Sequence, residues 1–159
     1  MRVPPRQVKI SAVAFSKADP ARVFVILKDG TNWPKWSIFD SVELERPGRD
    51  EPHGVGAIRV FVTKITRARE EVVELVHDRR LAYVLLDGFP LLDYHAVVEI
   101  EPDDGGSRIN WSASFYPKYP FTGWFWSLAL GKTLRTLSAR LADAAESPPT
   151  PSDAVVFEA

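Results

Sequence analysis

The chain has no cysteine among its 159 residues, and this absence excludes whole classes of site. Disulfide bridges, thiolate nucleophiles and cysteine-based zinc centres all need a residue that the sequence does not contain. Its three histidines, His53, His77 and His95, stand far apart and lack carboxylate neighbours at the spacing of metal ligands. The triplet Gly131-Lys132-Thr133 matches the end of a phosphate-binding loop, but Trp126 stands where that loop needs its first glycine. We therefore expect neither a metal site nor a cofactor.

The chain also lacks an excess of charge of either sign. It has 20 basic and 21 acidic residues, a net charge of −1 at pH 7, and both signs are spread along the sequence. A nucleic-acid-binding protein needs a basic stripe to meet phosphates, so we do not expect nucleic acid as a partner. The N-terminus lacks the apolar run of a signal peptide, and no apolar stretch approaches the ~20 residues of a membrane span. These absences predict a cytoplasmic protein without integral membrane association.

Aromatic residues, in contrast, are abundant and make up 11% of the chain. They concentrate in Trp33–Phe39, Tyr83–Tyr94 and Trp111–Trp126. The first cluster contains the stretch WPKW, in which Pro34 prevents a helix from continuing through it. Such clusters either fill a large core or line a cavity, and composition alone favours the core.

The order of the predicted elements indicates an α+β fold. Apolar patterns and turn residues predict strands over 8–15, 39–45, 57–63, 68–76, 81–86, 92–100 and about 108–115. Asp19 and Pro20 are suited to start a short helix, with a second short helix after it, and Thr122 to cap a long helix that ends near Glu146. We predict a curved antiparallel sheet with the long helix packed on it.

The domain boundaries follow from the same pattern. We expect a single domain over residues 1–146 and a flexible tail over 147–159, since the sequence after the helix begins PPTPSD. The sixth and seventh strands alternate cleanly around the turn at 102–106, which predicts one buried and one wet face. The fifth strand is a continuous apolar run, so its pattern does not decide which way Tyr83 faces.

Polar residues that point inward are the first candidates for chemistry. Arg59 is in phase with Phe61 on the third strand, and either Glu70 or Glu71 points inward on the fourth. A buried charge needs a partner or a ligand, because removing it from water is costly. An Arg–Glu pair across neighbouring strands would be purely structural, whereas the same groups in an apolar pocket would anchor the oxygen atoms of a ligand.

Several segments, taken in order, resemble one known superfamily. They are VFVILKDGTNWPKW, VGAIRVFV, EEVVELVHDRRLAYVL, LDYHAVVEIEPDDGGSRINWSASF and the final helix. Together they resemble the START-like (SRPBCC) superfamily and, within it, the polyketide cyclase/dehydrase and lipid transport family, over about Val8 to Glu146. The resemblance implies a helix-grip fold: a sheet of about seven strands wraps the long C-terminal helix, two short helices follow the first strand, and a deep cavity lies between sheet and helix.

The resemblance also implies which residues meet a ligand. It places these side chains inside: Trp33, Trp36, Phe61, Val84, Leu86, Tyr94, Trp111, Ala113, Phe115, Phe125 and Ala129, with Thr133 as a further candidate. Trp36 is expected to start the strand that runs past the pocket, and Trp33 to close its floor or mouth. The inward acid falls best on Glu70, with Glu71 one step of register away.

Three functions fit this interpretation. The first is a binding protein for a small lipophilic or aromatic molecule, such as a lipid, polyketide or isoprenoid. The second is a polyketide cyclase or dehydratase with Glu70 as base, Tyr94 as proton donor and Arg59 as oxyanion stabiliser. The third is a protein-interaction module, which predicts an exposed apolar patch in place of a deep cavity. The sequence leaves the oligomeric state open, a homodimer included.

Overall fold

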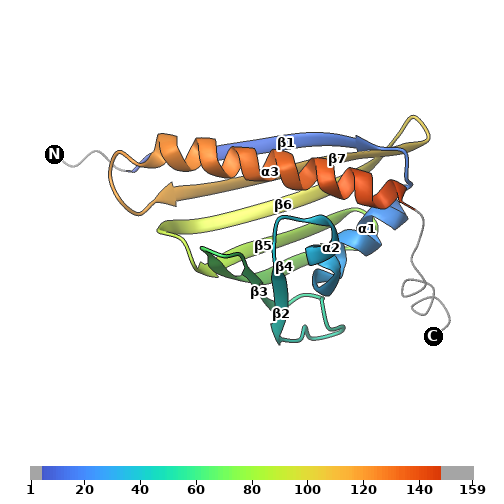
Figure 1. Cartoon of the computed structure of the whole chain (residues 1–159), viewed down its shortest axis with the longest axis horizontal. Coiled ribbons are helices and arrows are strands. Elements are labelled where there is room, and N and C mark those ends of the chain that lie inside the picture. Colours follow the sequence, from blue (N-terminus) through green and yellow to red (C-terminus); the bar gives the residue numbers. More distant parts are fainter. Residues whose placement is uncertain (1–4, 148–159) are drawn as a thin grey trace.

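The computed structural model describes residues 5–147, and its elements follow the predicted order (Figure 1). They are β1 (Val8–Ser16), α1 (Pro20–Lys28), the 3-10 turn η1 (Gly30–Asn32), α2 (Trp33–Trp36), β2 (Ser41–Arg46), β3 (Ile58–Val62), β4 (Arg67–Val76), β5 (Arg80–Asp87), β6 (Leu91–Asp103), β7 (Gly106–Pro117) and α3 (Gly123–Glu146). The predicted tail, residues 147–159, lies outside the described residues except for Ser147.

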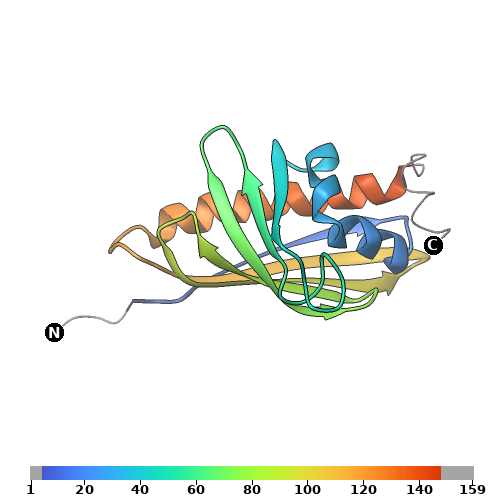
Figure 2. The ribbon, with the colours of Figure 1, turned by 90° about the horizontal axis from the view of Figure 1, so that it is seen from below.

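All the strands join one seven-stranded antiparallel sheet in the order β1-β7-β6-β5-β4-β3-β2. In Figure 2, α3 lies on one side of β1, β7 and β6, and the β2–β4 end of the sheet curls towards the same side. This arrangement confirms the predicted α+β helix-grip fold.

The two short helices are fixed by local hydrogen bonds. The Asp19 carboxylate accepts a hydrogen bond from the Arg22 backbone N–H at 2.9 Å, which caps α1, and Pro20 opens the helix. The Trp33 indole N–H donates to the Leu27 carbonyl oxygen at 2.9 Å and holds α2 against α1. Trp33 is therefore a fixed wall of the interior.

The long helix α3 has two different halves. Its C-terminal half buries Leu137, Leu141 and Ala145, and the Ser16 hydroxyl donates to the Ala142 carbonyl oxygen at 2.9 Å. Its first turns are apolar nearly all round and keep much more accessible surface. The C-terminal half thus packs on the sheet, and the N-terminal half covers a space that the sheet does not fill.

Candidate functional site

A cavity of about 470 Å³ lies under the N-terminal half of α3. The strands β4–β6, the α2–β2 segment and the β3–β4 loop form its other walls. It is lined by Trp33, Ile38, Phe39, Thr63, Ile65, Thr66, Ala68, Glu70, Tyr83, Leu85, Phe89, Leu91, Tyr94, Phe125, Trp126, Ala129, Leu130, Thr133, Leu134 and Leu137. The lining is mainly aliphatic and aromatic, which is typical of pockets for drug-sized molecules.

The cavity contains part of the set that the resemblance implied. Trp33, Tyr94, Phe125 and Ala129 line it, as does Thr133. The other predicted residues lie elsewhere, either behind this lining or on the outside of the molecule.

Four predicted aromatic or small residues lie in the core behind the cavity wall: Phe61, Trp111, Ala113 and Phe115. The Trp33 ring lies 4.9 Å from the Phe61 ring and 5.7 Å from the Trp111 ring, measured between centroids. Phe115 stacks on Tyr94 at 5.9 Å. These side chains support Trp33 and Tyr94 from behind.

The sequence pattern left the inward register of β5 open, and the residues that the resemblance placed inside, Val84 and Leu86, are the wrong ones. Tyr83 and Leu85 line the cavity, whereas Val84 points to the other face of the sheet and Leu86 is 42% exposed. Since successive side chains of a strand point to opposite faces, a shift of one residue inverts the whole set. The run LAYVLL is apolar at every position, so its sequence could not fix the phase.

Trp36 was also placed wrongly. It ends the helical turn α2 instead of starting a strand, and β2 begins only at Ser41. Pro34 stands in the first turn of α2, where proline is favoured, so the chain stays helical here. Trp36 packs on Trp33 with ring centroids 4.9 Å apart and borders a separate groove beside Arg140.

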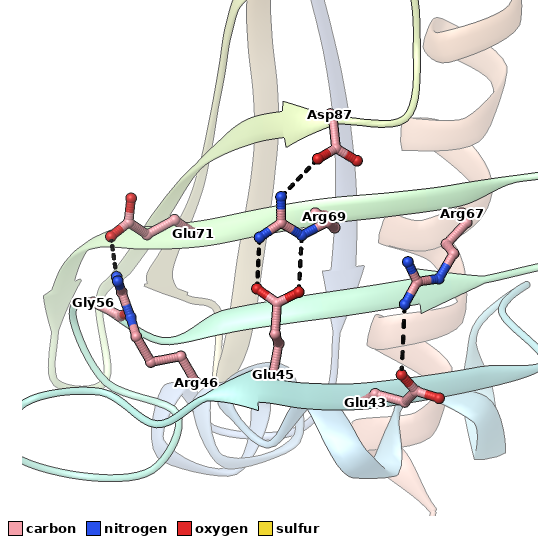
Figure 3. Close-up of polar contacts among 8 residues, drawn as sticks. All are labelled: Glu43, Glu45, Arg46, Gly56, Arg67, Arg69, Glu71 and Asp87. Carbon is pink, nitrogen blue, oxygen red and sulfur yellow. Dashed lines mark hydrogen bonds and ion pairs between the residues drawn. The ribbon is translucent and has the colours of Figure 1, made fainter.

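The choice between Glu70 and Glu71 is decided by the outer face of the sheet (Figure 3). Glu71 points outward and pairs with Arg46 at 2.7 Å, and Arg69 on the same face pairs with Glu45 and Asp87. Alternation along β4 then turns Glu70 inward, where it lines the cavity. Asp87 belongs to the outer ion pairs.

Glu70 is the one acid in the cavity lining. Burial raises the pKa of its carboxyl group from 4.5 to about 8, although the nearby Arg59 guanidinium opposes the shift. The accessible surface that Glu70 retains borders the cavity. No hydrogen bond from residues 5–147 engages its carboxyl group, so its hydrogen-bonding capacity is directed at the cavity.

Arg59 lies behind the lining and is fully buried. It faces Glu70 in the β3–β4 register without an ion-pair contact, so the predicted pair acts across a distance. Its Nη1 donates to the Lys28 carbonyl oxygen at 3.1 Å, and its Nε and Nη2 have no partner in the described structure. The guanidinium carbon lies 5.6 Å from the Trp33 ring centroid and 5.3 Å from that of Phe61, within the range of cation–π contacts.

Two tyrosines complete the polar end of the cavity. The Trp111 indole N–H donates to the Tyr83 hydroxyl at 3.1 Å, and the Tyr83 and Tyr94 ring centroids lie 6.5 Å apart. Burial raises the pKa of both phenols, so both keep their protons at neutral pH. The cavity thus joins an apolar body to a polar end with Glu70 and two hydroxyl groups.

Other hydroxyl groups of the lining are already engaged. The Thr63 and Thr66 hydroxyls share a hydrogen bond at 2.6 Å, and the Thr133 hydroxyl donates to the Ala129 carbonyl oxygen at 3.0 Å. Glu70 is thus the polar anchor without an internal hydrogen bond from residues 5–147, and the Tyr83 and Tyr94 hydroxyls lie near it.

Sequence reasoning missed several lining residues, notably Phe89, Trp126 and the threonines of the β3–β4 loop. The Trp126 signal was present, because the first turns of α3 are too apolar for a helix that rests on one sheet face.

Residues 5–147 contain no group of three or more histidine, aspartate and glutamate side chains arranged to hold a metal ion. Among the helices within those residues, none is long and apolar enough to cross a membrane.

Comparison with known proteins identifies the family. Residues 7–146 match the sequence profile of the family described as polyketide cyclase / dehydrase and lipid transport. No curated protein matches the chain.

Solved structures share the fold. A START superfamily protein from Mycobacterium smegmatis has a TM-score of 0.75 and 15% identity, covering 87% of this chain and 97% of that one. A protein from Thermobifida fusca has a TM-score of 0.67 and 25% identity, covering 85% and 93%. Norcoclaurine synthase from Thalictrum flavum, solved with dopamine and hydroxybenzaldehyde, has a TM-score of 0.72 and 14% identity, covering 92% and 91%.

Proposed function

Because the chain belongs to the polyketide cyclase / dehydrase and lipid transport family of the START-like superfamily, we propose that it binds a small lipophilic molecule in this cavity. The observation that carries the proposal is Glu70, a buried carboxyl group without an internal hydrogen bond that borders an otherwise apolar space. A buried polar group without a partner is costly, and a ligand that supplies the partner recovers that cost.

The chemistry of the polar end narrows the ligand class. With a pKa of about 8, Glu70 is mainly protonated at pH 7 and can donate a hydrogen bond to a carbonyl or hydroxyl oxygen. Tyr94 supplies a second hydroxyl, and Arg59 adds a positive charge behind the wall. A neutral molecule with an aliphatic or aromatic body and an oxygen function at one end fits best: a lipid, an aromatic polyketide or an isoprenoid. That the protein is cytoplasmic remains a prediction from its sequence.

Equilibrium binding of the neutral probe N-phenyl-1-naphthylamine, followed by its fluorescence, tests cavity binding. Competition by lipophilic ketones and alcohols of matched size then tests the polar end. We expect Glu70→Leu, which removes the hydrogen-bond donor, to weaken these competitors about tenfold, the effect of one lost hydrogen bond to a buried partner. Glu71→Leu, one residue away on the outer face, should leave both measurements unchanged. The proposal would be overturned if the native chain showed no saturable binding of the probe. It would also be overturned if the competitors bound the Glu70 and Glu71 variants with equal affinity.

A second candidate is an enzyme, favoured by the same pKa of about 8, which suits a general acid or base near neutral pH. Glu70 would move a proton, Tyr94 would donate one, and Arg59 would act through its charge, since it does not line the cavity. Substrate turnover that is lost in Glu70→Gln while binding of a product analogue survives would distinguish this function from binding alone.

A further inference from the structure

Large apolar side chains remain exposed on the β3–β4 loop, the β7–α3 loop and the first turns of α3, and two of them, Ile65 and Phe125, also line the cavity. Phe121 is 94% exposed and Ile65 is 91% exposed, and four neighbours on the β7–α3 loop and α3 are at least half exposed. These residues, which we call the rim patch, are Ile65, Tyr119, Phe121, Trp124, Phe125 and Leu128. In Figure 1 and Figure 2 the β3–β4 loop and the start of α3 lie towards the same end of the molecule. Exposed apolar residues gathered in this way mark an interaction surface.

The rim patch is continuous with the cavity. Ring centroids of Phe89 and Trp126 lie 5.8 Å apart, those of Trp126 and Phe125 5.1 Å, and those of Phe125 and Trp124 6.2 Å. Phe89 and Trp126 line the cavity, whereas Trp124 lies on the outside of α3. A row of aromatic rings therefore leads from the cavity lining to the outer surface.

The backbone holds Phe121 outward at a conformation that favours glycine. Its φ is +64°, in the left-handed region, and its side chain packs on almost nothing. Folding alone would be better served by glycine here, which points to a role for the exposed ring outside the folded chain.

Basic residues accompany the rim patch. Lys64 and Lys118 stand on the loops that carry it, and Lys132 follows Leu128 by one turn of α3. None of them forms an ion pair within residues 5–147. Asp87 at the end of β5 is held by Arg69, whereas two acids near this end have no ion pair within residues 5–147: Asp93 in β6 and the exposed Asp40, whose backbone N–H donates to the Val62 carbonyl oxygen beside the β3–β4 loop. The three lysines leave a small positive excess over these two acids.

We propose that the rim patch docks on the surface of an anionic lipid bilayer. Exposed tryptophan, tyrosine and phenylalanine with nearby lysines are the groups that settle in the interfacial region of such membranes. A second copy of the chain fits less well, because a two-fold contact of the patch with itself would oppose its lysines. Docking would let a lipophilic ligand pass between the bilayer and the cavity, and this consequence rests on the proposed function. The docking itself does not depend on it.

Co-sedimentation of the full chain with vesicles tests the docking. Phosphatidylcholine vesicles with and without phosphatidylglycerol are compared at low and high salt, with no ligand added. We expect binding that phosphatidylglycerol strengthens and salt weakens. The double variant Phe121→Gly, Trp124→Ser should bind at least about tenfold more weakly. Its thermal stability should not fall, because glycine relieves the backbone at residue 121.

The matched control is Phe15→Ser, which removes an aromatic side chain that is 65% exposed near the C-terminal end of β1, where Ser16 bonds to the C-terminal half of α3. Its vesicle binding should equal that of the native chain. Absence of binding to both vesicles, or equal binding by the double variant, would overturn the proposal. So would a native dimer that the double variant converts to a monomer without any vesicle binding. Because no ligand takes part, a negative result leaves the cavity proposal untouched.

Discussion

The raised pKa of Glu70 predicts a specific dependence of stability on pH. The folded state holds this proton up to about pH 8, whereas the unfolded chain releases it near 4.5. Between these values the folded state binds the extra proton, so the free energy of unfolding falls as pH rises. The destabilisation is absent below about pH 4.5 and complete above about pH 8.

Its magnitude follows from the same two values. At about 1.4 kcal/mol per pKa unit, the rise from 4.5 to about 8 corresponds to at most about 5 kcal/mol. Water that enters the cavity would reduce this figure, so a measured effect of about 2–5 kcal/mol agrees with the reasoning.

Urea unfolding of the native chain and of Glu70→Gln from pH 5 to pH 9 measures this change in the free energy of unfolding. Glutamine keeps the shape and does not titrate, so the variant should gain stability relative to the native chain as pH rises. The contributions of the other titrating groups to the pH dependence cancel when the free energies of the two proteins are subtracted. Glu71→Gln, on the outer face, is the matched control for the substitution itself. A difference between the native chain and Glu70→Gln that does not change with pH would refute the buried, proton-retaining carboxyl.

Further predictions concern two residues of the cavity lining and two turns of the sheet. Trp33→Phe removes the hydrogen bond to Leu27 and part of a buried ring, so the free energy of unfolding should fall by about 2 kcal/mol in urea titrations. Gly88→Ala should lower the melting temperature more than Gly105→Ala, because both have positive φ but only at Gly88 would a Cβ meet backbone, 2.5 Å from the Arg67 carbonyl oxygen. Ala129→Trp should fill the cavity at unchanged or higher stability, by the same assays.

The sequence predicted the fold well because its signals were local and repeated. Alternation fixed β7 and β6 from Tyr94 onward, although an irregularity before Tyr94 leaves the predicted inward residue Leu92 exposed and turns Leu91 to the cavity. A cap and a proline fixed the start of α1, and the apolar first turns of α3 indicated an extra apolar surface. The family resemblance joined these elements into the helix-grip fold, which no single motif specifies.

The lining of the cavity could be predicted only in part, and the reasons differ from residue to residue. Leu86 was misplaced because an unbroken apolar run carries no phase. Trp36 was misplaced because a single helical turn that contains a proline looks like a loop in sequence. Trp111 faces inward as predicted, but Trp33 and Tyr83 lie between it and the cavity. Which side chain covers which depends on residues from distant segments of the chain.

Native mass spectrometry of the freshly purified chain beside Ala129→Trp tests the central claim most directly. We predict that the native chain carries one small lipophilic molecule, releasable by organic solvent and bearing a carbonyl or hydroxyl group, and that the filled variant carries none. An adduct that persists equally in Ala129→Trp would contradict binding in this cavity. A native chain that stays bare and takes up no lipophilic ketone or alcohol on titration would contradict binding altogether.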